Sequence, residues 1–161
     1  MQISKRISNR AIGYIALVII LVIIYYVIPN AYDMKLRRTK INNMQYTEEL
    51  RWSVDSINVN DKYIDVSGWI LKPGTDSTNQ NVEIIIKNSR TGKMYKGNTS
   101  TVIREDLNEV FQTEKSNYMN SGFAVTFRNK ELGKKLEDWM IILKYSNNKM
   151  EYYVDTNTSL K

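Results

Sequence analysis

The residue types that most often carry catalysis are missing from this chain, which contains neither histidine nor cysteine. Without them there is no Ser-His-Asp triad, no thiolate nucleophile, and no zinc or iron held by histidine or thiolate. The seven glycines are scattered and form no phosphate-binding loop. The catalytic groups that remain are carboxylates, lysines and tyrosines.

Carboxylates occur as adjacent pairs at positions 105–106 and 137–138. Two carboxyl groups that flank a glycosidic bond are the machinery of most glycosidases, so a carboxylate-dependent glycosidase using Asp106 is one hypothesis. Neighbours on a strand point to opposite faces, however, and surface carboxylates in ion pairs are the commoner outcome. Asp61, Asp76 and Asp106 offer oxygen ligands for calcium, but without EF-hand spacing. We therefore expect no enzyme activity, no metal site and no cofactor.

Aromatic rings provide a second possible chemistry, because flat rings stack on the faces of sugars. The chain has 11 tyrosines and three tryptophans. A glycan-binding site would combine such rings with side chains that hydrogen-bond to hydroxyl groups. The candidate glycan contacts are Trp69, Tyr63, Asp76, Arg104 and Asp106.

The three tryptophans differ in their expected positions. Trp52 and Trp139 alternate in phase with leucine and isoleucine, so both are expected in the core. Trp69 is out of phase with the aliphatic residues of its own segment. Either it faces outward, or Gly68 marks a β-bulge that turns it inward.

The elements that would position these residues are mostly strands. Apolar and polar residues alternate with a period of two in the segments 50–59, 63–71, 82–87, 123–128, 139–145 and 150–155, and 93–98 would complete a hairpin. The first segment changes phase before Ile57. Helix is expected only around 104–113 and 131–136. Regular short strands rich in β-branched and aromatic residues predict an all-β sandwich or barrel.

Several short motifs occur in an order that resembles a family of β-sandwich modules. They are WSVDSI (52–57), VSGWI (66–70), GTDS (74–77), REDL (104–107) and SGF (121–123). The family is the immunoglobulin-like β-sandwich module of Gram-positive cell-surface proteins, attached to glycosyltransferases and membrane proteins of cell-wall or capsular polysaccharide synthesis. The match covers about residues 52–153. The chain departs from the family in Ile70, where a small residue follows the tryptophan, and in Leu107, where valine is usual.

This resemblance implies an immunoglobulin-like β-sandwich. Arg104 and Asp106 are the most polar residues among the matching motifs. Arg104 could offer a planar donor fork to a sugar acid or a phosphate, while Asp106 accepts from hydroxyl groups. The structural alternative is that the two residues tie a crossover loop to the sandwich through hydrogen bonds.

The N-terminal region contains an unbroken run of uncharged, mostly aliphatic residues over 11–28, preceded by Lys5, Arg6 and Arg10. As a helix the run would be about 27 Å long, close to the hydrocarbon thickness of a bilayer. It predicts a single transmembrane helix. The alternative is a cleaved signal peptide, but the run is longer than such peptides and lacks small residues at its end.

Charge and hydropathy suggest four parts. They are a cytoplasmic tail (1–10), a transmembrane helix (11–28), a basic stalk (29–47) and an extracytoplasmic β-sandwich domain (48–161). The net charge of +6 arises beside the predicted membrane segment, while basic and acidic residues balance from residue 46 onward. A nucleic-acid partner is therefore not expected, because such proteins concentrate basic residues on the folded domain.

These observations together predict a single-pass protein of the cell membrane of a Gram-positive bacterium. Its non-catalytic domain would bind cell-surface polysaccharide or help to assemble it, with the lipid membrane and a glycan as partners. The alternative is a protein-interaction subunit that docks onto a membrane glycosyltransferase or a cell-envelope assembly complex.

Overall fold

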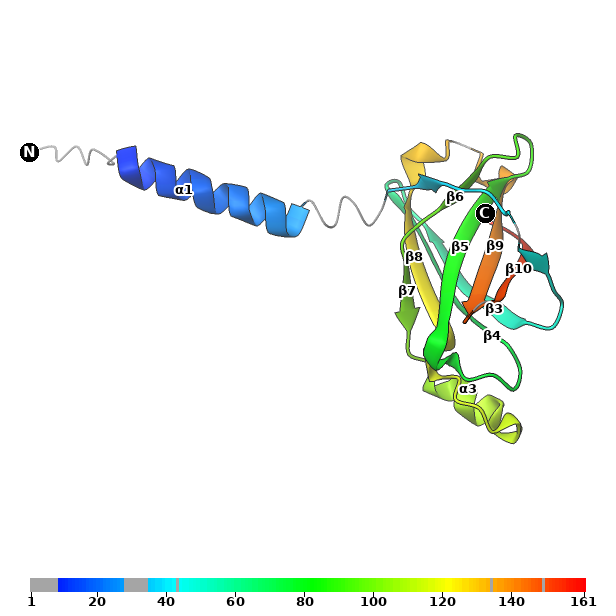
Figure 1. Cartoon of the computed structure of the whole chain (residues 1–161). Coiled ribbons are helices and arrows are strands. Elements are labelled where there is room, and N and C mark those ends of the chain that lie inside the picture. Colours follow the sequence, from blue (N-terminus) through cyan, green and yellow to red (C-terminus); the bar gives the residue numbers. More distant parts are fainter. Residues whose placement is uncertain (1–8, 28–34, 43, 134, 149) are drawn as a thin grey trace, which may run out of the picture. The chain divides into compact units, whose positions relative to one another are not determined.

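The chain forms two compact units, Met1–Asp33 and Met34–Lys161 (Figure 1). The first unit contains helix and the second contains mainly β-sheet. The computed structural model describes residues 9–27, 35–42, 44–133, 135–148 and 150–161.

The N-terminal unit contains the α-helix α1 (Asn9–Val22), which is followed by the π-helix η1 (Ile23–Val27). At 14 residues, α1 is about 21 Å long, whereas the hydrocarbon core of a bilayer is about 30 Å thick. Across the described residues, no helix combines the length and apolarity needed to cross a membrane. The spanning helix predicted for 11–28 is therefore not found, because α-helical geometry ends at Val22; position 28 lies outside the described residues.

The second unit is built from two β-sheets. The larger sheet has six strands in the order β1-β6-β5-β9-β10-β2, and the smaller has four in the order β3-β4-β8-β7. In the larger sheet the bounds are β1 (Arg37–Arg38), β6 (Met94–Lys96), β5 (Gln80–Asn88), β9 (Trp139–Asn147), β10 (Met150–Ser159) and β2 (Gln45–Tyr46). In the smaller sheet they are β3 (Arg51–Val59), β4 (Tyr63–Leu71), β8 (Gly122–Arg128) and β7 (Thr99–Val102). The mostly-β fold predicted from alternation is confirmed.

The core lies between the two sheets. One cluster of buried side chains combines alternate residues of β4 and β8 with alternate residues of β5 and β9, so the inner faces of the sheets pack on each other. Trp139 is buried in this cluster and Trp52 packs against it, as their phase predicts. The largest fully buried members from the strands are Tyr145, Phe123, Phe127, Ile64, Ile70, Ile84, Ile86 and Ile141.

Helical structure in this unit is short. The helix expected over 104–113 is present as α3 (Glu105–Val110), followed by the 3-10 turn η3 (Gln112–Glu114). The helix expected over 131–136 is wrong in type, because that region holds two separate 3-10 turns, η5 (Asn129–Glu131) and η6 (Leu136–Asp138). Gly133, with a φ of +79°, lies between these turns, and this left-handed conformation does not continue a right-handed helix. Two further 3-10 turns are η2 (Ser77–Asn79) and η4 (Met119–Ser121).

Part of the segment predicted as a stalk is integrated into the sheet. β1 and β2 lie at opposite edges of the six-stranded sheet, so the chain that joins them has to cross the sheet (Figure 1). Ile85 and Ile142 point away from the inter-sheet core, yet they are 0% and 1% exposed. The outer face of this sheet is therefore covered at these two residues. Leu36, just before β1, belongs to the main core cluster.

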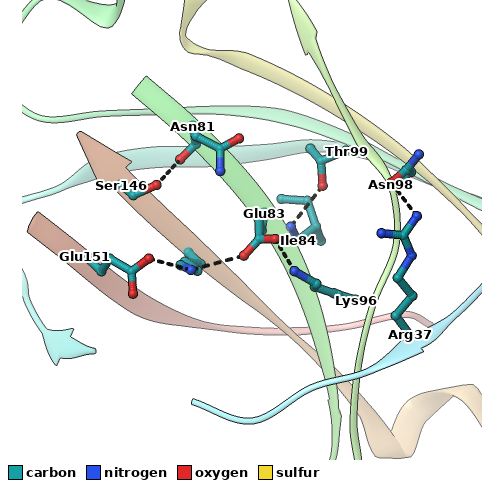
Figure 2. A network of polar contacts seen from close by, with 10 residues as sticks. Arg37, Asn81, Glu83, Ile84, Lys96, Asn98, Thr99, Ser146 and Glu151 are labelled. Carbon is teal, nitrogen blue, oxygen red and sulfur yellow. Dashed lines mark hydrogen bonds and ion pairs between the residues drawn. The ribbon is translucent and has the colours of Figure 1, made fainter. Parts of the chain in front are cut away.

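The same outer face carries a row of charges that links four strands (Figure 2). Glu83 on β5 pairs with Lys96 on β6 and, at 3.2 Å, with Lys144 on β9. Lys144 continues the row to Glu151 on β10 at 2.8 Å. Alternating charges of this kind hold neighbouring strands in register through cross-strand attraction.

Candidate ligand-binding face

The outer face of the four-stranded sheet collects the aromatic and polar candidates of β4. Alternation along β4 turns Tyr63, Asp65, Ser67 and Trp69 away from the core, and all four are partly exposed. Their register partners on β8 also point outward. We call this surface the polar face, and define it by Ser56, Tyr63, Asp65, Ser67, Trp69, Ala124, Thr126 and Arg128.

The side chains in the middle of the polar face are short, and most of them carry oxygen atoms. Thr126 donates its hydroxyl hydrogen to Asp65 at 2.6 Å, and the hydroxyls of Ser56 and Ser67 are hydrogen-bonded at 2.9 Å. Ala124 lies directly opposite Ser67. These short side chains leave a low floor, and six residues of strand place Tyr63 about 20 Å from Trp69 at its two ends.

At the Trp69 end, a β-bulge in β3 presents a carboxylate. The pairing of β3 with β4 slips between Val54 and Ser56, which leaves Asp55 as the extra residue. This bulge is the physical origin of the phase change that the sequence shows before Ile57. Asp55 is exposed and points toward Arg104, whose Nη1 lies 2.6 Å from Asp55 Oδ2.

Arg104 is held by two carboxylates. Besides the bond to Asp55, its Nε and Nη2 donate to the two oxygens of Asp106 at 2.8 and 2.7 Å. Hydrogen bonding to Asp106, and then to Asp55, raises the pKa of Arg104. The same guanidinium lowers the pKa of Asp106. This geometry favours the structural alternative, in which the arginine ties the start of α3 to the sheet.

A glycine gives the arginine its path across the sheet. A Cβ atom on Gly122 would lie 2.7 Å from Arg104 Cγ and 2.5 Å from the carbonyl oxygen of Val102. Gly122 pairs with Trp69 on one side and with Val102 on the other. The aliphatic part of Arg104 therefore fits over β8 only because position 122 has no side chain.

The glycosidase hypothesis finds little support in this arrangement. A glycosidase needs one carboxylic acid that stays protonated near neutral pH, which requires a raised pKa. Asp106 has a lowered pKa and shares its partner with Asp55. In the adjacent pair at 137–138, Asp138 forms an ion pair with Arg90 at 2.9 Å.

Trp69 faces outward and is partly covered by the segment after α3. Its ring lies 5.8 Å from the ring of Phe111 in an edge-on arrangement, and both rings pack against a second buried cluster. Within β4 the pairing with β8 is regular, so no bulge at Gly68 turns the tryptophan inward. Trp69 thus combines a packed edge with a partly exposed surface. The second cluster consists of Leu71, Leu107 and Tyr118.

Asp76 lies apart from the polar face. Its side chain accepts a hydrogen bond from the backbone N–H of Asn117 at 2.7 Å, so it joins the loop before η2 to the loop before η4. Asp61 lies in the turn between β3 and β4, and Asp106 pairs with Arg104. Among the residues described, no group of three acidic side chains is arranged to hold a metal ion.

At the Tyr63 end, the polar face leads into a pocket of about 250 Å³. It is lined by Asp61, Lys62, Tyr63, Arg128 and Lys130. Tyr63 and Arg128 are direct cross-strand partners.

Of the predicted residues, the structure brings Trp69, Arg104 and Asp106 to one end of the polar face and Tyr63 to the other. Sequence reasoning missed Asp55 and the cations Lys62, Arg128 and Lys130. The change of phase inside segment 50–59 was the available signal for Asp55. The cations stand at the ends of adjacent alternating segments, but only the sheet order shows that those ends meet.

Comparison of the chain with protein-family models, with curated proteins and with solved structures found no match.

Proposed function

We propose that this protein is a non-catalytic β-sandwich module that binds cell-surface polysaccharide and is anchored to the membrane of a Gram-positive bacterium. The observation that carries the proposal is the polar face. It combines a low floor of hydroxyl and carboxylate groups with an aromatic ring at each end. An extended glycan needs such a surface, because its hydroxyls seek hydrogen bonds while its sugar faces stack on rings.

The dimensions of the polar face suit an extended polymer. The separation of about 20 Å between Tyr63 and Trp69 would accommodate several sugar units along β4. Ser67 and Ala124 have small side chains and keep the middle of the path low, while Arg104 lies across the sheet close to Trp69. A short glycan bound at one end would use only one of the two rings.

The sequence resemblance supports the same assignment. The motifs of residues 52–57, 66–70 and 104–107 resemble modules attached to glycosyltransferases and membrane proteins of polysaccharide synthesis. The finer description as an immunoglobulin-like sandwich is part of this proposal. So is the placement of the domain outside the cytoplasm.

The membrane part of the proposal rests on residues 11–28. Their composition is almost wholly aliphatic, and the large apolar side chains between Ile12 and Tyr25 are exposed. Lipid is the environment in which such side chains are favourable. Extraction of bacterial membranes with alkaline carbonate tests this part: the chain should remain in the pellet, and recovery in the supernatant would contradict anchoring.

The glycan part is tested with the full-length chain purified in mild detergent. Isothermal titration with purified wall and capsular polysaccharides should detect binding to at least one of them. Tyr63→Ala and Trp69→Ala should each weaken that binding about fivefold or more, because each removes a central ring contact.

Tyr46→Ala is the matched control, since Tyr46 is 51% exposed and lies on β2 of the other sheet. It should bind like the wild type. Because Trp69 packs on Phe111, thermal unfolding of every variant has to be measured alongside. Absence of binding to all wall and capsular glycans at millimolar sugar concentration would refute the proposal.

A second candidate function is docking to a membrane glycosyltransferase or another envelope protein. It is favoured by the edge strand β7, where Val102 and the following Ile103 are exposed. An extended segment of the partner could add a strand at this edge. Copurification from membranes of a stoichiometric partner, lost in Val102→Asp but kept in Ser100→Asp, would favour docking over glycan binding.

A further inference from the structure

The pocket at the Tyr63 end has a marked excess of positive charge. Among the described residues, its lining contains the cations Lys62, Arg128 and Lys130 and the carboxylate Asp61. Lys62 and Lys130 are exposed, while Arg128 is partly buried and has an interaction partner of its own. Two exposed lysines beside one small volume attract an anion more strongly than either would separately.

The rim of the pocket is held in place by hydrogen bonds between two loops. Asn60 accepts the backbone N–H groups of Lys62 and Tyr63 on its side-chain oxygen at 2.9 and 2.8 Å. Asn129 joins the second loop to the first, because its backbone N–H donates to Lys62 at 2.9 Å and its side-chain amide donates to Asn60 at 2.7 Å. Binding there would therefore require little ordering of the backbone.

The volume limits what the pocket can hold. At about 250 Å³ it is smaller than the roughly 300–1,000 Å³ of sites for drug-sized molecules. It suits one small group, such as a phosphate or one sugar with a carboxylate. A second, more open hollow of about 510 Å³ adjoins it and shares Asp61 and Lys130, so a longer molecule could continue past the pocket.

Tyr63 connects the pocket to the polar face. Its ring lines the pocket, and its position on β4 begins the row that runs to Trp69. A sugar stacked on Tyr63 would hold a substituent beside the cations of the rim. At the opposite end Arg104 is paired with two carboxylates, whereas the pocket at the Tyr63 end is lined by the exposed lysines Lys62 and Lys130.

We propose that the pocket formed by Lys62, Tyr63, Arg128 and Lys130 binds an anionic group carried by the polysaccharide, a phosphate or a carboxylate. The ligand class is then a negatively charged glycan. This inference rests on the proposed function. It adds that the glycan is negatively charged and that its charged group binds at the Tyr63 end of the polar face.

The test uses the full-length chain in mild detergent and three probes. The first is polygalacturonic acid, the second is the same polymer after reduction of its carboxylates to alcohols, and the third is a phosphodiester-linked wall polymer. The two charged probes should bind more tightly than the neutral one, and their affinities should fall as salt screens the charges.

Lys62→Gln and Lys130→Gln should each weaken binding of the charged probes about two- to fivefold and leave the neutral probe unaffected. Lys93→Gln, an exposed lysine at the β5–β6 turn, is the control and should have no effect. Arg128 is left unchanged because it is partly buried in the sheet. Loss for only one charged probe would identify its group, phosphate or carboxylate, as the one recognised.

The binding measurements separate loss of anion recognition from loss of glycan binding. If charged and neutral polymers bind equally and both lysine variants match the wild type, the anionic pocket is refuted while glycan binding stands. If no polymer binds, both are refuted. If inorganic phosphate binds in a lysine-dependent manner but no polymer does, the pocket takes a free anion and the inference about the glycan is overturned.

Discussion

Arg104 Nη1 lies 2.6 Å from Oδ2 of Asp55, a residue 49 positions earlier in the chain. The contact exists because the bulge in β3 leaves Asp55 outside the regular pairing with β4. Asp106 occupies the other side of the same guanidinium. One cation therefore joins the bulged edge strand, the sheet beneath it and the first turn of α3.

Removing the arginine should cost more than removing one of its partners. We expect Arg104→Ala to lower the free energy of unfolding by about 1–2 kcal/mol, because it breaks three charged hydrogen bonds and leaves two carboxylates without their cation. Asp55→Asn should cost less than about 1 kcal/mol, since Arg104 keeps Asp106. Urea unfolding followed by tryptophan fluorescence measures both.

Arg90→Ala is a suitable comparison, because its pair with Asp138 is single and Arg90 is 61% exposed. Its effect should be smaller than that of Arg104→Ala. If Arg104→Ala cost no more than Arg90→Ala, the pairing seen at Arg104 would have no structural importance, and its guanidinium would again be a candidate for ligand binding.

Gly122→Ala tests the path that the arginine takes. The added methyl group would meet both Arg104 Cγ and the carbonyl oxygen of Val102, so we expect a loss of about 1–3 kcal/mol. In an Arg104→Ala background one of the two clashes is gone, and the same substitution should cost less. A double-mutant cycle measured by urea unfolding gives this difference, and strict additivity would contradict the proposed contact.

Alternation in the sequence predicted most of the strands, because each of them buries one face against the other sheet. The segments 63–71 and 150–155 show how accurately alternation predicts the bounds of a strand. The first coincides with β4, whereas β10 extends to Ser159 through a register shift after Asp155 that alternation does not signal. β7 was missed because it is a short edge strand with mostly exposed residues.

The N-terminal crossing was not predictable from local pattern. β1 and β2 have two residues each and form only because longer strands are present to pair with them. Nothing local marks Leu36 as a core residue in a segment that is otherwise basic and polar. A pairing between residues far apart in sequence decides its burial, and a single chain does not reveal such pairings.

The candidate site was predictable only in part, because alternation shows which residues of one strand share a face but not which distant segments lie beside them. Alternation along 63–71 set Trp69 out of phase with the aliphatic residues, but it left open whether Trp69 faces outward or is turned inward by a bulge at Gly68; the regular pairing of β4 with β8 decides for the outward position. The neutralisation of Arg104 by Asp55 depends on a bulge and on the order of strands in the sheet, so the fork appeared available when only the sequence around 104–106 was considered.

The charge row on the six-stranded sheet predicts a pH dependence of stability. Burial alone would raise the pKa of Glu83, but the hydrogen bonds and charges of Lys96 and Lys144 outweigh it, so the pKa lies below the 4.5 of an ordinary glutamate. A carboxylate with a lowered folded-state pKa stabilises the fold above its unfolded pKa and loses that contribution as the pH falls.

We therefore expect Glu83→Gln to be less stable than the wild type at pH 7, with a difference that shrinks as the pH is lowered from about 6 to about 3. Thermal unfolding across this range measures it. Glu48→Gln, at an exposed position, serves as the control for loss of a negative charge. A difference that stays constant with pH would mean that the paired charge of Glu83 does not contribute to stability.

The last prediction concerns Leu36, which is 8% exposed and belongs to the core cluster although it precedes the first long strand. Leu36→Ala should lower the free energy of unfolding by about 2–3 kcal/mol, because it opens a cavity in that cluster. Ile103→Ala, at a position that is 56% exposed, should change it by less than about 0.5 kcal/mol. Equal, small effects of the two substitutions would mean that the chain before β3 acts as a loose stalk. A large effect at Leu36 alone would mean that the folded domain begins before the strand pairing at Arg37, so the linker to the apolar helix is shorter than the sequence suggests.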